Sequence, residues 1–188
     1  TREGLRGIRG RRTQRKTILI DSESFASTHV LVSSRLKQKI ESIFPEIPSA
    51  DLAKPGLETD PHVTLLYGIV SDDPAQAKSV LSKFCPISLL TTGISLFERP
   101  EYDVLKIDVV SPGASLIHDT LKTSLENKWE WPDYQPHITL AYLKKGVGRS
   151  YCAPGAIPDF YGHLFVAGEV VFTDSKDKKT VIELGGKK

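Results

Sequence analysis

The chain has 188 residues, of which 39% are hydrophobic and 26% are charged, and its formal net charge is +2. This is long enough to bury a core, and it fits one domain or two small fused lobes. No apolar run approaches the roughly 18 residues of a membrane span, and no hydrophobic segment follows the basic N-terminus as in a secretory signal. We therefore expect a soluble cytoplasmic protein with no membrane partner.

The charge is unevenly distributed. Residues 1–16 carry seven arginine and lysine side chains against one acid, Glu3, so the remainder is slightly acidic. We interpret 1–16 as a flexible basic arm, a tail or linker that can also touch nucleic acid, and 17–188 as one domain.

Cys85 and Cys152 have neither the paired spacing of a zinc site nor the density of a disulfide scaffold, so we expect ordinary thiols.

The first half of the chain predicts strands and helices around one histidine motif. A short aliphatic patch at 17–20 precedes a β-branched strand at 27–32, in which His29 is expected on a solvated face or near a cleft. Helical spacing predicts a helix over 34–44, and a loop follows at 49–60.

The sequence PHVTLLYG at 61–68 predicts a strand. Side chains alternate along a strand, so His62 and Thr64 share one face. A helix over 73–84 follows, with Asp73 as its cap and Pro74 at its first position.

The second half predicts a hairpin, a helix and a second copy of the motif. Alternating residues predict strands over 87–97 and 102–110, and the helix that opens at 111–112 leaves His118 partly exposed. Both tryptophans lie in WEWPDYQ, directly before PHITLAYL, where His137 and Thr139 again share one face.

The last segment is rich in glycine and proline from 146 to 162 and predicts a long surface loop. Two strands follow, at about 164–172 and 180–184, and His163 has no partner motif, so we assign it a structural role. With one histidine strand in each half, we predict an α+β bilobal fold, in which two antiparallel sheets face a central groove and helices cover their outer faces.

Two histidines in matching frames suit general acid–base catalysis. With unperturbed pKa values near 6.5, one ring can be held neutral and the other protonated, so one accepts a proton while the other donates one. Such a pair can cleave a phosphodiester beside a ribose hydroxyl, while Thr64 and Thr139 hold the phosphate oxygens. The alternatives are a zinc site, for which we find no further ligands, a purely structural repeat, and a binding module without turnover.

The motifs PHVTLLYG and PHITLAYL resemble those of the 2H phosphoesterase superfamily, which includes the bacterial RNA cyclic phosphodiesterases formerly called RNA ligases. The order of elements from about Phe25 to Leu184 is also similar to that family. The resemblance implies that His62 and His137 are the acid and base, that Thr64 and Thr139 bind phosphate, and that no metal ion or cofactor is needed.

The sequences FASTHVLV, HVTLLYG and PHITLAYLK together are most similar to a branch found in phages. That branch includes the anti-CBASS nucleases, which cut cyclic di- and trinucleotide signals of bacterial immunity, so the resemblance implies a cyclic oligonucleotide as substrate and the bacterial host cytoplasm as location. Aromatic side chains available to stack on its bases are Phe25, Tyr67, Trp131, Tyr134 and Tyr151, and the resemblance makes Glu169 a candidate acceptor for a base edge.

Two further interpretations stay open. The first is an enzyme that opens RNA 2',3'-cyclic phosphates or cleaves linear 2',5'-oligonucleotides, and the basic arm favours such longer RNA. The second is an inactive nucleotide-binding module with the same residues. In each case we expect a monomer.

Overall fold

The computed structural model describes residues 24–185, so the predicted basic arm and the patch at 17–20 lie outside the described residues. Its helices are α1 (Ser34–Ile43), α2 (Ala75–Leu81), α3 (Pro112–Ser124) and α4 (Gly148–Tyr151), with 3-10 turns at Phe44–Glu46 and Ser49–Asp51. Its strands are β1 (Ala26–Leu31), β2 (Leu52–Leu57), β3 (His62–Ile69), β4 (Ile87–Glu98), β5 (Tyr102–Val110), β6 (His137–Lys144), β7 (Leu164–Ala167), β8 (Glu169–Thr173) and β9 (Lys179–Glu183).

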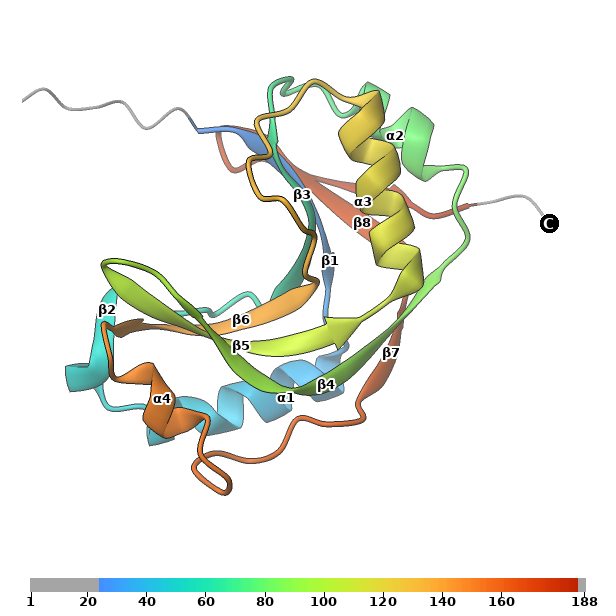
Figure 1. Ribbon diagram of the computed structural model, residues 1–188. Helices are drawn as coiled ribbons and strands as arrows, with labels where there is room; N and C mark the ends of the chain where they lie inside the picture. Colours follow the sequence, from blue (N-terminus) through green and yellow to red (C-terminus); the bar gives the residue numbers. More distant parts are fainter. Residues whose placement is uncertain (1–23, 186–188) are drawn as a thin grey trace, which may run out of the picture.

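In this part of the chain the nine strands form one curled antiparallel sheet, in the order β7-β4-β5-β6-β3-β1-β8-β9, with β2 paired to β6. The predicted division into two sheets is therefore wrong. The two halves are joined where β3 pairs with β6 through Val63 and Ile138. From this contact the arms diverge, β5 and β6 in one direction and β3 with β1 in the other, and a groove opens between them (Figure 1).

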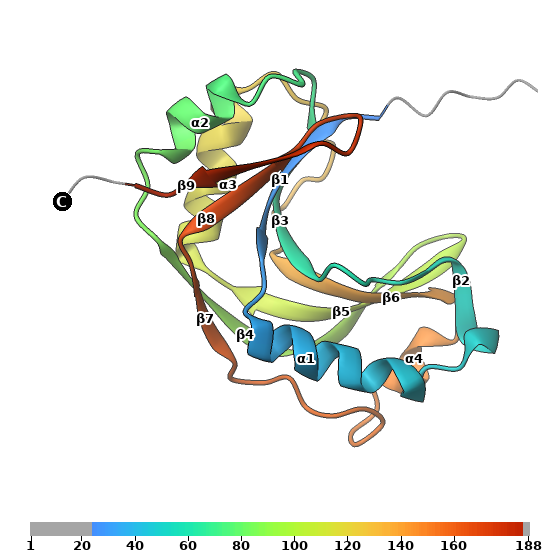
Figure 2. The same cartoon turned by 180° about the vertical axis from the view of Figure 1, so that it is seen from behind.

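The helices lie on the outer side of the curl, as Figure 2 shows for α1 below β4 to β6 and for α2 and α3 near β8 and β9. Ser33 caps α1 by accepting a hydrogen bond from the Leu36 amide, and Ser111 caps α3 in the same way. Each helix buries an apolar face, which includes Leu36 and Ile40 on α1 and Ile117 and Leu121 on α3. Burial of such faces, more than helix propensity, stabilises helices of this length.

Four predicted assignments are wrong. The predicted loop at 49–60 contains β2, and α2 ends at Leu81 because the chain turns before Phe84. The predicted surface loop at 146–162 contains α4 and buries Phe160 completely. The predicted strand at 164–172 is two strands, β7 and β8, separated by Gly168 and placed far apart in the sheet order.

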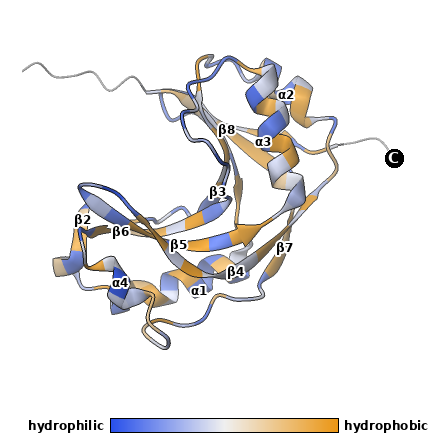
Figure 3. Ribbon diagram, in the orientation of Figure 1, coloured by the Kyte–Doolittle hydropathy of each residue, from blue (hydrophilic) through white to orange (hydrophobic). Residues whose placement is uncertain are grey.

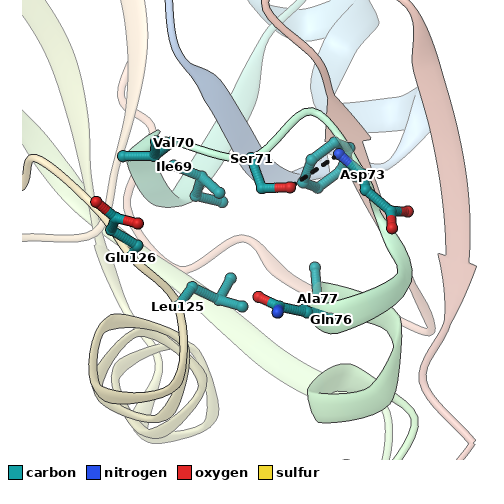
Figure 4. Close-up of a pocket in the computed structure, with 9 residues that line it drawn as sticks. Ile69, Val70, Ser71, Asp73, Gln76, Ala77, Leu125 and Glu126 are labelled. Atoms are coloured by element: carbon teal, nitrogen blue, oxygen red, sulfur yellow. Dashed lines mark hydrogen bonds between the residues drawn. The ribbon is translucent and has the colours of Figure 1, made fainter.

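Apolar residues lie mainly in the strands and on the inner helix faces, whereas the segment from α3 to β6 is largely hydrophilic (Figure 3). Among residues 24–185, no helix is long and apolar enough to cross a membrane. A small cavity of about 170 Å³ lies between the end of β3, α2 and the end of α3, with Asp73 and Glu126 among its lining residues (Figure 4). It shares no lining residue with the groove.

Candidate active site

The two histidines of the repeated motif have the same tautomer. His62 Nδ1 lies 2.7 Å from the Asp60 carbonyl oxygen, and His137 Nδ1 lies 2.7 Å from the Gln135 carbonyl oxygen. A carbonyl oxygen only accepts, so each Nδ1 carries the proton and donates it. In both rings Nε2 is therefore the nitrogen left for proton transfer.

The proline of each motif accounts for this shared geometry. Pro61 lies between Asp60 and His62, and Pro136 lies between Gln135 and His137. Proline fixes φ near −65°, which restricts where the preceding carbonyl lies relative to the following side chain. The P-H dipeptide is thus part of each site, because it helps to hold the carbonyl against the ring.

Each histidine strand contains a bulge at the same place in the repeat. On β3 the register with β1 goes from Thr64 to Leu66 and skips Leu65, and on β6 the register with β5 goes from Thr139 to Ala141 and skips Leu140. A bulge resets the alternation of side chains. His62, Thr64 and Tyr67 thereby share one face of β3, and the same holds for His137, Thr139 and Tyr142 on β6.

The pairing of β3 with β6 brings the four motif side chains together. The strands are antiparallel at Val63 and Ile138, so one residue further in each direction Thr64 lies beside His137 and His62 lies beside Thr139. These four side chains are half-buried, whereas the alternating Val63, Leu65, Ile138 and Leu140 are fully buried. The motif strands are therefore neighbours at the centre of one sheet, and they do not face each other from two sheets.

In the half-site on β3, which we call half-site 1, the neighbouring strand contributes His29. This residue is in register with Thr64, and its ring centroid lies 4.6 Å from that of His62. Of the two expected places for His29, a solvated face and the neighbourhood of a cleft, the first is wrong, because its side chain is only 6% exposed. Its Nε2 has no hydrogen-bond partner among the described residues. Burial, followed by the charge of His62, lowers the pKa of His29 from 6.5 to about 4, so the ring is neutral at pH 7.

In the half-site on β6, half-site 2, the neighbouring strand contributes a lysine and an aspartate. Lys106 is in register with Thr139, and Asp108 is in register with His137. Phe97 on β4 packs edge-on against His137, with ring centroids 4.9 Å apart.

The pKa of His137 is lowered, chiefly by burial. The charges of Lys106 and His62 act in the same direction. The hydrogen bond to the Gln135 carbonyl and the Asp108 carboxylate oppose them without reversing the shift. The neutral, proton-accepting form of His137 is thus favoured at pH 7.

The groove holds a pocket of about 350 Å³ that includes Thr64, His137 and Thr139. Three of the predicted stacking residues, Tyr67, Trp131 and Tyr134, line this pocket. Other lining residues were not predicted, and they come from β4, β5 and β6, from the turn between β4 and β5 and from the segment before β6: Phe97, Tyr102, Tyr142, Arg99 and Trp129. Aromatic side chains thus flank the motif residues on both arms of the groove.

The segment WEWPDYQ is fixed to half-site 1 by Tyr134. Its hydroxyl donates to the Thr64 carbonyl oxygen at 2.8 Å, and its ring stacks on His118 with centroids 4.1 Å apart. His118 is only 2% exposed and donates from Nδ1 to the Leu65 carbonyl at 2.6 Å, so the prediction of a partly exposed histidine is wrong. Burial raises the pKa of Tyr134 and lowers that of His118, which keeps both side chains neutral in this stack.

The other three predicted substrate residues do not line the pocket. Tyr151 is buried on α4, and its hydroxyl donates to Asp51 Oδ2 at 2.6 Å, so the structure gives it a packing role. Phe25 is half-buried just before β1. Glu169 is exposed at the start of β8, where it pairs with Glu183 of β9. None of the three is among the residues that line the groove pocket.

The residues that sequence reasoning missed become neighbours of the motif only through strand register. Lys106, Asp108 and Phe97 lie 29 or more positions before His137, and nothing near them in the sequence resembles the motif. Tyr142 had a local signal, because it occupies in the second repeat the place that Tyr67 occupies in the first. In residues 24–185, no group of three or more His, Cys, Asp or Glu side chains is placed to hold a metal ion.

Comparison with known protein families finds one match. The family described as the 2'-5' RNA ligase superfamily matches residues 34–151, which is more than half of the chain and includes both motifs. No curated protein is significantly similar in sequence.

Solved structures share the fold at low identity. The protein TT0787 of Thermus thermophilus is 15% identical with a TM-score of 0.63, over 87% of this chain and 100% of that one. LigT of E. coli, solved with 3'-AMP, is 14% identical with a TM-score of 0.58, over 86% of this chain and 95% of that one. Usb1 of Kluyveromyces marxianus is 11% identical with a TM-score of 0.53, over 86% of this chain and 99% of that one.

Proposed function

Because the chain belongs to the 2'-5' RNA ligase superfamily of 2H phosphoesterases, we propose that it is a metal-independent phosphodiesterase that cleaves cyclic di- or trinucleotides and thereby antagonises bacterial CBASS immunity. One observation carries this choice of substrate. Three of the four motif side chains, Thr64, His137 and Thr139, line a single groove that also holds Tyr67 and Trp131 on one arm and Tyr102 and Tyr142 on the other.

This arrangement fits a phosphodiester with a base on each side. A phosphate held by Thr64 and Thr139 would place one nucleoside toward each arm, and each stacked base contributes about 1 to 3 kcal/mol. A terminal 2',3'-cyclic phosphate has a nucleoside on one side only of its reacting phosphorus. The sequence FASTHVLV, which resembles the phage branch, adds independent support.

The proposed reaction uses one imidazole as base and the other as acid. The base takes the proton of a ribose 2'-hydroxyl through Nε2, and the new oxygen–phosphorus bond forms. The bond from phosphorus to the departing oxygen breaks, and the acid gives its Nε2 proton to that oxygen. The Thr64 and Thr139 hydroxyls donate to the non-bridging oxygens, on which negative charge builds up. Each step uses only groups of this chain and of the substrate.

The experiment compares three substrates in the presence of EDTA: cyclic dinucleotides, cyclic trinucleotides and an RNA ending in a 2',3'-cyclic phosphate. The full chain is assayed beside the His62→Ala and His137→Ala variants. We expect linear products from the cyclic oligonucleotides with the unaltered chain and none with either variant.

The other outcomes each overturn a part of the proposal. Cleavage of the RNA end alone would replace cyclic oligonucleotides with RNA as the substrate. Tight binding without products would make the chain a binding module. Activity that EDTA removes and zinc restores would contradict the metal-independent reaction.

A further inference from the structure

Lys106 is a buried cation in half-site 2. Its side chain lies on the groove face of β5, in register with Thr139, and the residue is 3% exposed. The ammonium donates to Ser95 Oγ at 2.6 Å and forms an ion pair with Asp108 Oδ1. A buried ammonium is costly unless its hydrogen bonds are made, and here two partners hold it in place.

The ammonium and the His137 imidazole share one neighbour. Lys106 Nζ lies 4.3 Å from the centroid of the Phe97 ring, and the same ring packs edge-on against His137. The other charged or titratable groups near His137 are Asp108 of β5 and His62 of β3. The positive charge of Lys106 lowers the pKa of His137, because it disfavours a second positive charge on the imidazole.

Half-site 1 has no such cation at the corresponding position of the described structure. There the residue in register with the threonine is His29, which is buried and neutral, and Leu31 takes the place of Asp108. The carboxylate of Asp60, which interacts electrostatically with His62, pairs with Lys179 at 2.7 Å and with Lys37 at 4.0 Å. The two half-sites are therefore built alike but carry different charges.

We propose that Lys106, held by Ser95 and Asp108 beside Phe97, is a positioning residue that assigns the roles of the two histidines, so that His137 is the base and His62 the acid. This assignment rests on the proposed phosphodiesterase function. His137 Nε2 takes the proton of the 2'-hydroxyl as the oxygen–phosphorus bond forms. His62 Nε2 gives its proton to the departing 5' oxygen as the other bond breaks.

A substrate with sulfur in place of the departing 5' oxygen tests the assignment. A thiolate leaves without being protonated, so such a linkage does not need the acid. With a cyclic dinucleotide modified in this way, we expect the His62→Ala variant to recover most of the unaltered chain's rate and the His137→Ala variant to recover none. Recovery by His137→Ala, or by neither variant, would overturn the assignment.

The role of Lys106 is tested by the pH dependence of kcat/KM, whose acid limb reports the base of the free enzyme. Replacing the ammonium in Lys106→Met removes one cause that lowers the pKa of His137 and leaves Asp108, which raises it. We expect the acid limb to move to higher pH, so that activity falls more at pH 6 than at pH 8. Lys106→Arg keeps the charge and should keep the limb where it is.

A matched control comes from the lysine that follows β6 and pairs with another aspartate of β5. Lys145→Met removes an ammonium that pairs with Asp103 at 3.0 Å outside the groove, and the acid limb should stay unmoved. A Lys106→Met variant that loses activity equally at all pH values would give Lys106 a purely structural role and overturn the proposal. Failure of the unaltered chain to cleave either substrate would instead refute the proposed function.

Discussion

Half-sites 1 and 2 share their backbone and differ in their neighbours. In both, the histidine Nδ1 donates a hydrogen bond to the carbonyl oxygen two residues before it. Both strands also contain a threonine, a bulge and a tyrosine that lines the groove. The neighbouring strand supplies a neutral His29 to half-site 1 and a charged Lys106 to half-site 2. The comparison shows that the repeat builds the geometry, whereas the neighbouring strands set the electrostatics.

The largest expected effect follows from what the half-sites share. Because both Nε2 atoms take part in proton transfer, His62→Ala and His137→Ala should each lower kcat by about 10²- to 10⁴-fold on an unmodified substrate. His163→Ala, whose ring contacts Lys39 outside the groove, is the matched control and should retain activity. A loss of less than tenfold in either motif variant would show that the half-sites are not partners.

The next effect tests the burial of His29 in half-site 1. Its folded pKa of about 4 lies below the value of 6.5 for the unfolded chain, so the unfolded chain binds a proton more readily as the pH falls. Above pH 6.5 the ring is neutral in both the folded and the unfolded chain, so His29 does not lower the free energy of unfolding there. Between pH 6.5 and 4 the free energy of unfolding should fall by about 3 kcal/mol from this residue.

Urea denaturation at a series of pH values measures that fall. His118, His137 and His163 also have lowered pKa values, so His29→Asn should reduce the slope without removing it. An unchanged slope in this variant would mean that His29 is protonated in the folded protein.

The third effect tests whether both arms bind a base. Tyr67→Ala and Tyr142→Ala should each weaken binding by about 1 to 3 kcal/mol, which titration of a cyclic dinucleotide into an inactive histidine variant can measure. Tyr161→Ala is the control, because this tyrosine is exposed and does not line the pocket. A loss confined to one arm would favour a substrate with one nucleoside, such as an RNA end.

The smallest effect concerns the bulge of half-site 1. Thr28 Oγ1 accepts from the Leu66 amide at 3.2 Å, next to the residue that the register skips. Thr28→Val should lower the free energy of unfolding by about 1 kcal/mol, because the buried Leu66 amide loses its acceptor. The effect is small because this hydrogen bond is long. A thermal melt compares it with Thr123→Val on the exposed face of α3. Equal melting temperatures for the two variants would show that Thr28 does not stabilise the bulge.

Local patterns predicted much of the fold and the centre of the site. Alternation placed His62 with Thr64 and His137 with Thr139, and helical spacing found α1 and α3, because these signals depend on residues a few positions apart. The bulges were not predicted, although two apolar residues interrupt the alternation before each tyrosine in HVTLLY and HITLAY.

The remaining features depend on contacts between distant residues. Whether two histidine strands face each other or lie side by side is decided by the pairing of Val63 with Ile138, which no local pattern encodes. Register alone brings Lys106 and Asp108 to His137. Tyr151 has the composition of a stacking residue, but the packing of α4 buries it against Asp51.

The central claim is tested most directly by incubating the full chain with a cyclic dinucleotide in EDTA and separating the products. We predict a linear product from the unaltered chain and intact substrate with His62→Ala and with His137→Ala. Intact substrate with all three proteins, for cyclic trinucleotides as well, would contradict it.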